Sequence, residues 1–330
     1  MRYTLAPRQW KQRTSPPHLP LIIHSKKKLR LPRIHSKRLL VRLLVIIAFL
    51  AFLPFVVFHF RLRWLQKMRT RRCSWLENPP LVCAHGGDSS RSAPNSVDAY
   101  HIAIQSEVDC IEIDVSRTSD GTLFALHDRD LQRMSGNDTL KVGFMKSLEI
   151  KKLEAGLNGS TGKVPTIHEA LKFVSSSVKQ VILDVKVGPP LFEEGLAKDV
   201  ISVVQRSGCS NYLIWAKSDI LSLDVMKLTE KTMVGYIVMR DPVTGATSNL
   251  LRMKNASVVG VYHMLINNSL VQILHGAGKK VYAWTVDDVD SMQKLLFERV
   301  DAIVTSYPTL LKKVMQKLEA ECREEGFALP

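Results

Sequence analysis

The first 76 of the 330 residues contain no aspartate or glutamate, although they hold 18 lysines and arginines. The formal net charge of +15 therefore belongs to this leader, because the remaining residues carry 28 basic and 31 acidic side chains. A folded domain with a slight negative charge lacks the basic groove that nucleic-acid recognition requires. The charge distribution argues against a nucleic-acid partner.

Long uncharged apolar runs are also absent, except for one inside the leader. Leu43–Phe58 has 16 residues without a charge, and Leu39–Phe60 extends the apolar stretch to 22. This length is at the lower end for a transmembrane helix, and Pro54 is expected to kink it. The run is followed by "RLRWLQKMRTRR" rather than by small residues of a cleavage site. This pattern favours an uncleaved single-pass anchor over a cleaved signal peptide, with an arginine-rich transit peptide as the competing interpretation.

The orientation of this anchor is not decided by charge alone. Seven basic residues lie in Lys26–Arg38 and six in Arg61–Arg72, so both flanks are positive. Four sequences suitable for N-glycosylation follow the anchor, beginning at Asn137, Asn158, Asn255 and Asn267. We therefore expect a membrane glycoprotein with a cytosolic N-terminus and its folded domain on the lumenal or extracellular side.

Cysteine is scarce, with five residues in the whole chain. Cys83 and Cys110 lie in apolar runs typical of strands, where buried thiols are more common than bridges. Cys73, Cys209 and Cys322 do not have the spacing of metal ligands. Because no cysteine–histidine set is present, a zinc site is disfavoured.

The sequence predicts one α/β domain after the leader. We divide the chain into a basic tail (1–38), a transmembrane helix (39–60), a basic linker (61–78) and a single domain (79–330).

A dinucleotide-binding domain is disfavoured because no Gly-x-Gly-x-x-Gly motif follows an early strand. Apolar, β-rich runs alternate with stretches of helical periodicity. The expected strands are Leu81–Ala84, Cys110–Val115, Gln180–Val185, Tyr212–Ala216, Met233–Met239, Ser257–Tyr262, Lys280–Thr285 and Ala302–Thr305.

Eight apolar strands, each followed by a helix, predict a parallel (β/α)₈ barrel, known as a TIM barrel. A doubly wound open sheet would show the same alternation and remains the alternative. Leu123–Gly162 interrupts the rhythm and is expected to form a short extra strand plus a polar insertion after the second strand.

Carboxylates lie near the ends of two expected strands, where the active sites of barrels are found. Glu112 and Asp114 are two residues apart, so their side chains point to the same side of one strand and can share a metal ion. Asp184 ends another strand and adds a third carboxylate. Three carboxylates suit a hard divalent cation, Mg²⁺ or Ca²⁺.

Histidines accompany these carboxylates. His85 precedes Gly86 and Gly87, whose backbone N–H groups can approach an anion closely. His127 is followed by Asp128, which could orient its ring. Two histidines beside a metal-bound phosphate form a suitable acid–base pair at neutral pH.

Further residues are candidates for substrate binding. Lys186 follows Asp184 on the same face of its strand and could neutralise phosphate or pair with a carboxylate. Trp284, near the end of the seventh strand, forms either an apolar wall of the pocket or part of the core. Lys217, Arg240 and His263 are weaker candidates, chosen only because they follow strands.

From Leu81 to Pro308 the sequence resembles the glycerophosphodiester phosphodiesterase family, most closely its membrane-anchored plant members. The matching segments are "AHGG", "PNS…AY", "DCIEIDVSRTSDGTLFALHD", "ILDVK", "YAWTVDD" and "VDAIVTSYP". The resemblance implies a TIM barrel, a divalent cation, and hydrolysis of glycerophosphodiesters to sn-glycerol 3-phosphate and an alcohol. It implies that His85 and His127 are catalytic.

The same resemblance assigns the metal ligands to Glu112, Asp114 and Asp184, with Lys186 beside them. Asp184 stands where the family usually has a glutamate, so this carboxylate reaches about one methylene less far. The attacking group is either water or a neighbouring glycerol hydroxyl, which would form a cyclic phosphate.

Two departures from the family pattern concern the phosphate. The family's His-Arg-Gly is His85-Gly86-Gly87 here, and its Pro-Glu-Asn-Thr is Ala93-Pro94-Asn95-Ser96. The joint loss of an arginine and a glutamate suggests that the two pair in other members, because losing both leaves no buried charge uncompensated. Arg91 could supply a replacement charge, although no motif assigns it that role.

Two other functions remain open at this point. The anchor would suit a lysophospholipase D type enzyme that acts on membrane lipids. The missing arginine and glutamate would suit a catalytically weakened barrel that only binds phosphodiesters.

Overall fold

The computed structural model describes residues 37–156, 163–230, 232–241 and 243–327, so most of the predicted basic tail lies outside the described residues. The chain divides into a first unit, Met1–Leu62, and a second unit, Arg63–Pro330. The described part of the first unit belongs to helix α1 (Lys37–Cys73), which runs through Pro54. Lys37–Leu65 is long and apolar enough to cross a membrane, judged by length and composition.

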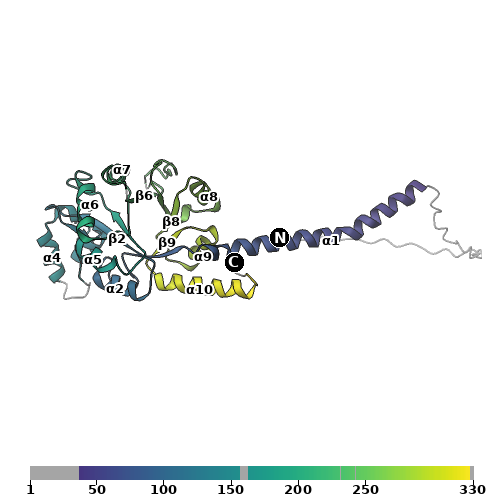
Figure 1. The fold of residues 1–330 in the computed structure, drawn as a ribbon, viewed down its shortest axis with the longest axis horizontal. Helices are drawn as coiled ribbons and strands as arrows, with labels where there is room; N and C mark the ends of the chain where they lie inside the picture. The colour runs from purple at the N-terminus through teal and green to yellow at the C-terminus, as the bar shows by residue number, and fades with distance from the viewer. Residues whose placement is uncertain (1–36, 157–162, 231, 242, 328–330) are drawn as a thin grey trace, which may run out of the picture. The chain divides into compact units, whose positions relative to one another are not determined.

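The second unit contains a closed barrel of eight parallel strands (Figure 1). The strands are β1 (Leu81–His85), β2 (Cys110–Arg117), β4 (Gln180–Val185), β5 (Tyr212–Ala216), β6 (Met233–Val238), β7 (Val258–Tyr262), β8 (Lys280–Trp284) and β9 (Ala302–Thr305). Each strand pairs with the next, and β9 pairs with β1. This closure confirms the predicted TIM barrel and excludes the open doubly wound sheet.

Helices surround the barrel, and polar caps begin several of them. They are α2 (Val97–Gln105), α5 (Ile167–Val174), α6 (Leu196–Ser207), α7 (Asp219–Leu228), α8 (Asn268–Gly276), α9 (Val289–Glu298) and α10 (Pro308–Glu324). Thr166 and Glu169 form a reciprocal capping box at the start of α5. The connection from β6 to β7 differs from the prediction, because its described residues contain no helix.

Residues alternate along each strand between two apolar layers. Ile111 and Ile113 of β2 face the surrounding helices and belong to the larger hydrophobic cluster. Cys110 belongs to a second cluster that fills the barrel interior together with Trp215 and Tyr282. The inward-facing positions of β2 therefore change from apolar Cys110 at the start of the strand to acidic side chains towards its end. This change places charge at one rim of the barrel, above an apolar floor.

The insertion after β2 folds around its own small core. It contains the antiparallel strand β3 (Leu123–Ala125), α3 (Asp128–Ser135), the 3-10 turn η2 (Val142–Phe144) and α4 (Ser147–Gly156). Its buried cluster consists of Phe124, Leu126, Leu131, Val142, Ile150 and Val164. The extra strand is thus present as predicted, while residues 157–162 lie outside the described residues. The insertion is more apolar inside than its composition suggests.

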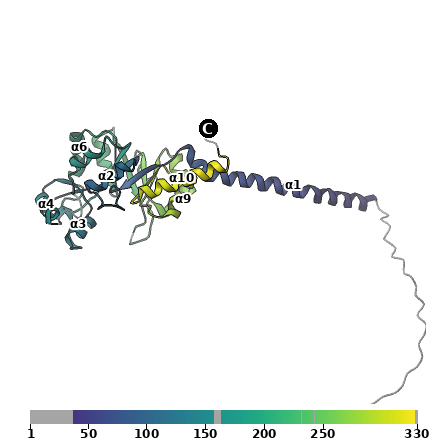
Figure 2. The ribbon, with the colours of Figure 1, turned by 90° about the horizontal axis from the view of Figure 1, so that it is seen from below.

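A disulfide joins the end of α1 to the C-terminal helix. Cys73 is bonded to Cys322 of α10, with Cα atoms 5.8 Å apart, and Arg72 pairs with Glu321. Trp75, in the segment predicted to be a linker, is almost fully buried in the large hydrophobic cluster. The residues just before β1 therefore contribute to the core. In Figures 1 and 2, α10 lies alongside α9.

The structure also bonds Cys83 to Cys110, so the expectation of two buried thiols was wrong. These residues are direct partners in the pairing of β1 with β2, which brings their side chains together inside the barrel. Pairing between strands that are distant in sequence cannot be read from the local apolar pattern, and Cys209 remains a buried free thiol.

Candidate active site

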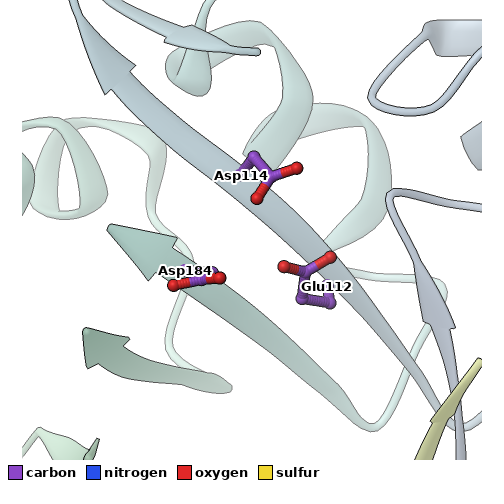
Figure 3. Close-up of side chains that lie close together, drawn as sticks. All are labelled: Glu112, Asp114 and Asp184. Atoms are coloured by element: carbon purple, nitrogen blue, oxygen red, sulfur yellow. The ribbon is translucent and has the colours of Figure 1, made fainter. Parts of the chain in front are cut away.

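Three carboxylates converge at the C-terminal rim of the barrel (Figure 3). Glu112 and Asp114 come from β2 and Asp184 from β4, where Asp114 and Asp184 are direct register partners. One oxygen from each lies within 4.8 Å of the others. Glu112 and Asp114 are 1% exposed. We call these three residues the carboxylate cluster. Its geometry agrees with the prediction that Glu112 and Asp114 face the same way and that Asp184 joins them.

Lys186 partly neutralises the cluster. Its Nζ lies 2.6 Å from Asp114 Oδ1 and also pairs with Asp184. Burial disfavours the charged lysine, but attraction by Asp114, Asp184 and Glu112 outweighs it and raises the pKa of Lys186. Burial alone would raise the pKa of Asp114, because it disfavours the charged carboxylate. Lys186, His85 and His127 outweigh this effect and lower the pKa of Asp114. Lys186 is therefore engaged with carboxylates in the described structure.

Glu112 shows that the negative charge is not fully compensated. Burial raises its pKa well above the usual value, and repulsion by Asp114 and Asp184 adds to this shift. Three carboxylates and one ammonium leave two negative charges, and among the described residues Asp184 Oδ1 is buried without a hydrogen-bond partner. A divalent cation would supply the missing charge and a partner for that oxygen. The residues present therefore fit a metal ion.

Asn95 positions the cluster, a role that the sequence did not reveal. Its Nδ2 donates to Asp114 Oδ2 at 2.8 Å, while its Oδ1 accepts the Asp114 backbone N–H at 3.0 Å. Asn95 also has a left-handed backbone, with φ of 60°, and its N–H donates to the Gly86 carbonyl. Asn95 is a buried residue with a strained backbone, and its side chain holds both the carboxylate and the backbone N–H of Asp114. Such residues are typical of functional sites.

His85 ends β1 and is the register partner of Glu112. Burial lowers its pKa; Asp114 opposes this effect, while Arg129 and Lys186 reinforce it. Its Nε2 lies 3.5 Å from Arg129 Nη2. Because a guanidinium can only donate, this contact favours the neutral tautomer of His85 that carries its proton on Nδ1 and turns the Nε2 lone pair towards the rim.

His127 has the opposite tautomer. It caps the start of α3, where its Nδ1 accepts the backbone N–H of Arg129 at 3.2 Å, so the neutral ring carries its proton on Nε2. Burial lowers the pKa of His127 to about 4, against the attraction of Asp114. Asp128 accepts the backbone N–H of Val142 at 2.9 Å, so this carboxylate holds two parts of the insertion together rather than orienting the His127 ring.

The two glycines after His85 have different surroundings. Gly86 N–H donates to Glu112 Oε2 at 3.0 Å, so the anion that it approaches is a carboxylate of the cluster. A Cβ on Gly87 would lie 2.6 Å from the carbonyl carbon of Ala99, and the residue has φ of +85°. Close approach of α2 therefore requires glycine at position 87.

Two adjoining cavities open at the rim and share Asp184 and Lys217 in their walls. The larger, about 200 Å³, is also lined by His127 and Lys186. The smaller, about 30 Å³, is also lined by His85, Glu112, Trp215 and Trp284. Trp284 is therefore a wall residue of the pocket as well as a neighbour of the interior cluster. Of the three weaker rim candidates, Lys217 lines both cavities, whereas Arg240 and His263 line neither.

Known proteins resemble this chain in sequence. The sequence model described as "Glycerophosphoryl diester phosphodiesterase family" matches residues 85–310. Glycerophosphodiester phosphodiesterase GDPD4 of Arabidopsis thaliana is 51% identical over 300 residues, which cover 90% of this chain and 92% of the relative. A glycerophosphodiester phosphodiesterase of Caldanaerobacter subterraneus is 29% identical over 245 residues, covering 72% and 98%.

Solved structures share the fold at lower identity. An Oleispira antarctica phosphodiesterase in complex with the product sn-glycerol-3-phosphate has a TM-score of 0.63 at 23% identity, covering 72% of this chain and 97% of its own. A glycerophosphoryl diester phosphodiesterase from Silicibacter pomeroyi has a TM-score of 0.61 at 17% identity, covering 79% and 99%. At these identities the likeness extends to the fold alone.

Proposed function

This chain belongs to the glycerophosphoryl diester phosphodiesterase family, and we propose that it hydrolyses glycerophosphodiesters to sn-glycerol 3-phosphate and an alcohol. The observation that carries this proposal is the arrangement at the rim. Two histidines of opposite tautomer line adjoining cavities that share Asp184 of the carboxylate cluster. Such a site can place a charged phosphodiester between a proton acceptor and a proton donor.

The carboxylate cluster would hold Mg²⁺ or Ca²⁺. When bound, such a cation supplies positive charge that polarises the phosphoryl group. Asp114 is kept ionised by Lys186 and fixed by Asn95, which orients one of its oxygens. Asp184 has a shorter side chain than glutamate, so we expect the Asp184→Glu variant to change the preference between the two cations.

The histidine tautomers suggest how protons move. His85 Nε2, with its lone pair towards the rim, would take the proton from the attacking hydroxyl. The negative charge of the bound phosphodiester would raise the pKa of His127 from its low value and so favour the protonated ring. This imidazolium would donate its Nε2 hydrogen to the oxygen of the leaving alcohol and return to a neutral imidazole. Lys186 and Gly87 would contact the phosphate, and Trp284 would contact the glycerol.

We further propose that the enzyme is a single-pass membrane glycoprotein with its barrel on the lumenal or extracellular side. The bond between Cys73 and Cys322 supports this orientation, because stable disulfides form in oxidising compartments. Asn137, Asn255 and Asn267 are exposed, as acceptor sites must be. Enzymatic deglycosylation of the protein from its native membrane should increase its electrophoretic mobility. An unchanged mobility would contradict the glycoprotein proposal.

The activity is tested with the full chain in detergent micelles, because Cys73 and Trp75 belong to the core and truncation would remove them. Release of sn-glycerol 3-phosphate from glycerophosphocholine should require Mg²⁺ or Ca²⁺ and stop with EDTA. Asp184→Asn should lose this activity, whereas Asp224→Asn, a carboxylate on α7, should keep it.

Three results would contradict the proposed function or favour another one. Turnover that persists with EDTA would contradict the role of the metal. Cleavage of lysophosphatidylcholine, but not glycerophosphocholine, would favour the lipid phosphodiesterase. Binding without turnover of either substrate would favour the weakened barrel.

A further inference from the structure

We propose that Arg129 binds the non-bridging oxygens of the substrate phosphate, an inference that rests on the proposed function. Arg129 lies in the first turn of α3, directly after the histidine that caps this helix. Its guanidinium reaches the end of β1, where Nη2 lies 3.5 Å from His85 Nε2 and 4.0 Å from Asp114 Oδ2. The side chain thus places a permanent positive charge beside His85 and the carboxylate cluster, close enough to both histidines to lower their pKa values.

These neighbours do not occupy all the hydrogen-bond donors of the Arg129 guanidinium. Asp114 already interacts with Lys186 at 2.6 Å and with Asn95 at 2.8 Å, so its contact with Arg129 at 4.0 Å is the longest of the three. The Arg129 side chain is 49% exposed, and a half-exposed pair at that distance contributes little to stability. Within the described part of the chain its guanidinium has no shorter polar contact, which leaves donors free for a ligand.

Position 86, which follows His85, cannot carry the positive charge that binds the phosphate. A Cβ on Gly86 would lie 3.0 Å from the Pro94 Cβ and 3.2 Å from the Asn95 nitrogen, and Gly86 has φ of +63°. A long side chain there would be strained and crowded. The cation must therefore come from another element, and α3 of the insertion provides it.

The other cations near the site are less suited to this role. Lys186 shares its ammonium between Asp114 and Asp184, so it can offer the phosphate one remaining donor rather than a pair. Lys217 follows β5 and joins the walls of both cavities, but among the described residues its ammonium has no hydrogen bond or ion pair with His85 or the carboxylate cluster. Arg91, the replacement considered from the sequence, is exposed, and among the described residues its guanidinium makes no hydrogen bond or ion pair with the carboxylate cluster.

Phosphate recognition also fits the chemistry of arginine. A guanidinium presents parallel N–H groups that match two oxygens of one phosphate, whereas an ammonium acts as a single point charge. A guanidinium that turns onto the phosphate would also release the lone pair of His85 Nε2, which could then accept the proton of the attacking hydroxyl. Arg129 is therefore a binding residue for the reaction, and its removal should weaken the affinity for every phosphate ligand.

The experiment compares four full-length proteins in detergent micelles with the bound cation: wild type, Arg129→Ala, Arg129→Lys and Arg206→Ala. Arg206 is an exposed arginine in the last turn of α6, just before the start of β5 and so at the opposite end of the barrel. Arg129→Ala should lower kcat/KM for glycerophosphocholine about 10- to 100-fold and weaken inhibition by inorganic phosphate by a similar factor. Arg129→Lys should recover only part of this loss, and Arg206→Ala should behave as wild type.

A second readout separates binding from structural damage. Guanidinium ion at millimolar concentration should restore part of the activity of Arg129→Ala, because it can occupy the space of the missing group. Unchanged phosphate inhibition in a folded Arg129→Ala protein would overturn the proposal. If that variant does not fold, Arg129→Gln and Arg129→Lys provide the same comparison.

The outcome does not depend on turnover. If the wild-type protein hydrolyses no glycerophosphodiester, binding of sn-glycerol 3-phosphate and of inorganic phosphate is measured by calorimetry. Loss of that binding in Arg129→Ala supports the proposal even though the proposed activity has failed. Equal binding by wild type and variant contradicts it.

Discussion

The carboxylate cluster and the cationic groups around it are held in different ways. Glu112, Asp114 and Asp184 project from paired strands, so the register of the sheet determines where they lie. His127 and Arg129 lie at the start of α3 in the insertion, and Lys217 follows β5. Glu112 and Asp114 are nearly inaccessible, whereas Arg129 is half exposed. We call Arg129 and Lys217 the rim cations.

This difference suggests that the two halves of the site have different tolerance to change. A carboxylate on a barrel strand cannot move without disturbing its neighbours, because strand pairing and the packed interior hold its backbone. A cation on a helix end or loop can come from one of several positions and still reach the same phosphate. A family can therefore keep its metal ligands and exchange the source of its phosphate-binding charge.

The largest expected effect tests the carboxylate cluster. Glu112→Gln should reduce kcat/KM by more than about 10³-fold, because a metal ion contributes several kcal/mol to transition-state stabilisation. The same variant should raise the thermal stability of the metal-free protein, since it removes a buried carboxylate that is repelled by two others. Calorimetry with EDTA checks this second effect. A lower melting temperature would show that the Glu112 carboxylate stabilises the metal-free protein.

Separate roles for the histidines predict the next largest effect. His127→Ala should slow hydrolysis of glycerophosphocholine by about 10²- to 10³-fold, the usual range for loss of a general acid. A glycerophosphodiester with a nitrophenol leaving group needs no proton donor, so His127→Ala should regain most of its activity on that substrate. His85→Ala should remain slow on both. Equal recovery by the two variants would mean that the tautomers do not assign the roles.

A smaller effect is expected for Asn95, which holds Asp114 of the carboxylate cluster in place. Asn95→Ala should weaken metal affinity and activity about 10- to 100-fold, because residues that orient a metal ligand typically have effects of this size. Raising the metal concentration should restore part of the loss. Asn78→Ala, at an exposed position before β1, is the matched control. An Asn95→Ala protein with normal metal dependence would remove Asn95 from the site.

The smallest effect concerns stability rather than catalysis. Asp120 accepts hydrogen bonds from Thr118 and from the backbone and side chain of Ser147, and these hold its pKa at about 2. Because the pKa is lower in the folded state, this stabilisation is present at neutral pH and is lost as the pH falls from about 4 to about 2. Asp120→Asn should destabilise the protein by about 0.5–1 kcal/mol at pH 7, as expected for an exposed cap.

The measurement is chemical denaturation between pH 7 and pH 2. The stabilities of wild type and Asp120→Asn should converge at the acidic end, while kcat at neutral pH stays unchanged. Asp120 anchors the start of α4 in the insertion, so a changed kcat would show that anchoring of the insertion also positions the rim cations.

Much of the barrel was predictable because it depends on local pattern. The β-rich runs around Gln180–Val185 and Ala302–Thr305 have the predicted bounds in the structure, since apolar residues bounded by turns specify buried parallel strands directly. The two-residue spacing of Glu112 and Asp114 likewise predicted a shared direction. These inferences need only the sequence within one strand.

Residues whose role depends on distant partners were not predictable. Asn95 stood in the matching segment "PNS" without a role, Arg129 had no sequence signal except its place after "HD", and Arg91 was chosen by proximity in sequence alone. Arg129 is near His85 because α3 folds back over β1 from 44 residues further along the chain. Cys83 meets Cys110 through strand pairing, which the apolar pattern around each residue does not encode.

The sequence by itself determined the charged leader, the apolar segment, the eight strands and the three carboxylates, because each depends on composition or on a repeat of two residues. Only the tertiary structure decided that the sheet closes, that Cys73 meets Cys322, and which cation stands beside His85. The reason is physical: closure, cross-linking and rim contacts arise from packing between segments far apart in the chain. Local periodicity carries no information about that packing.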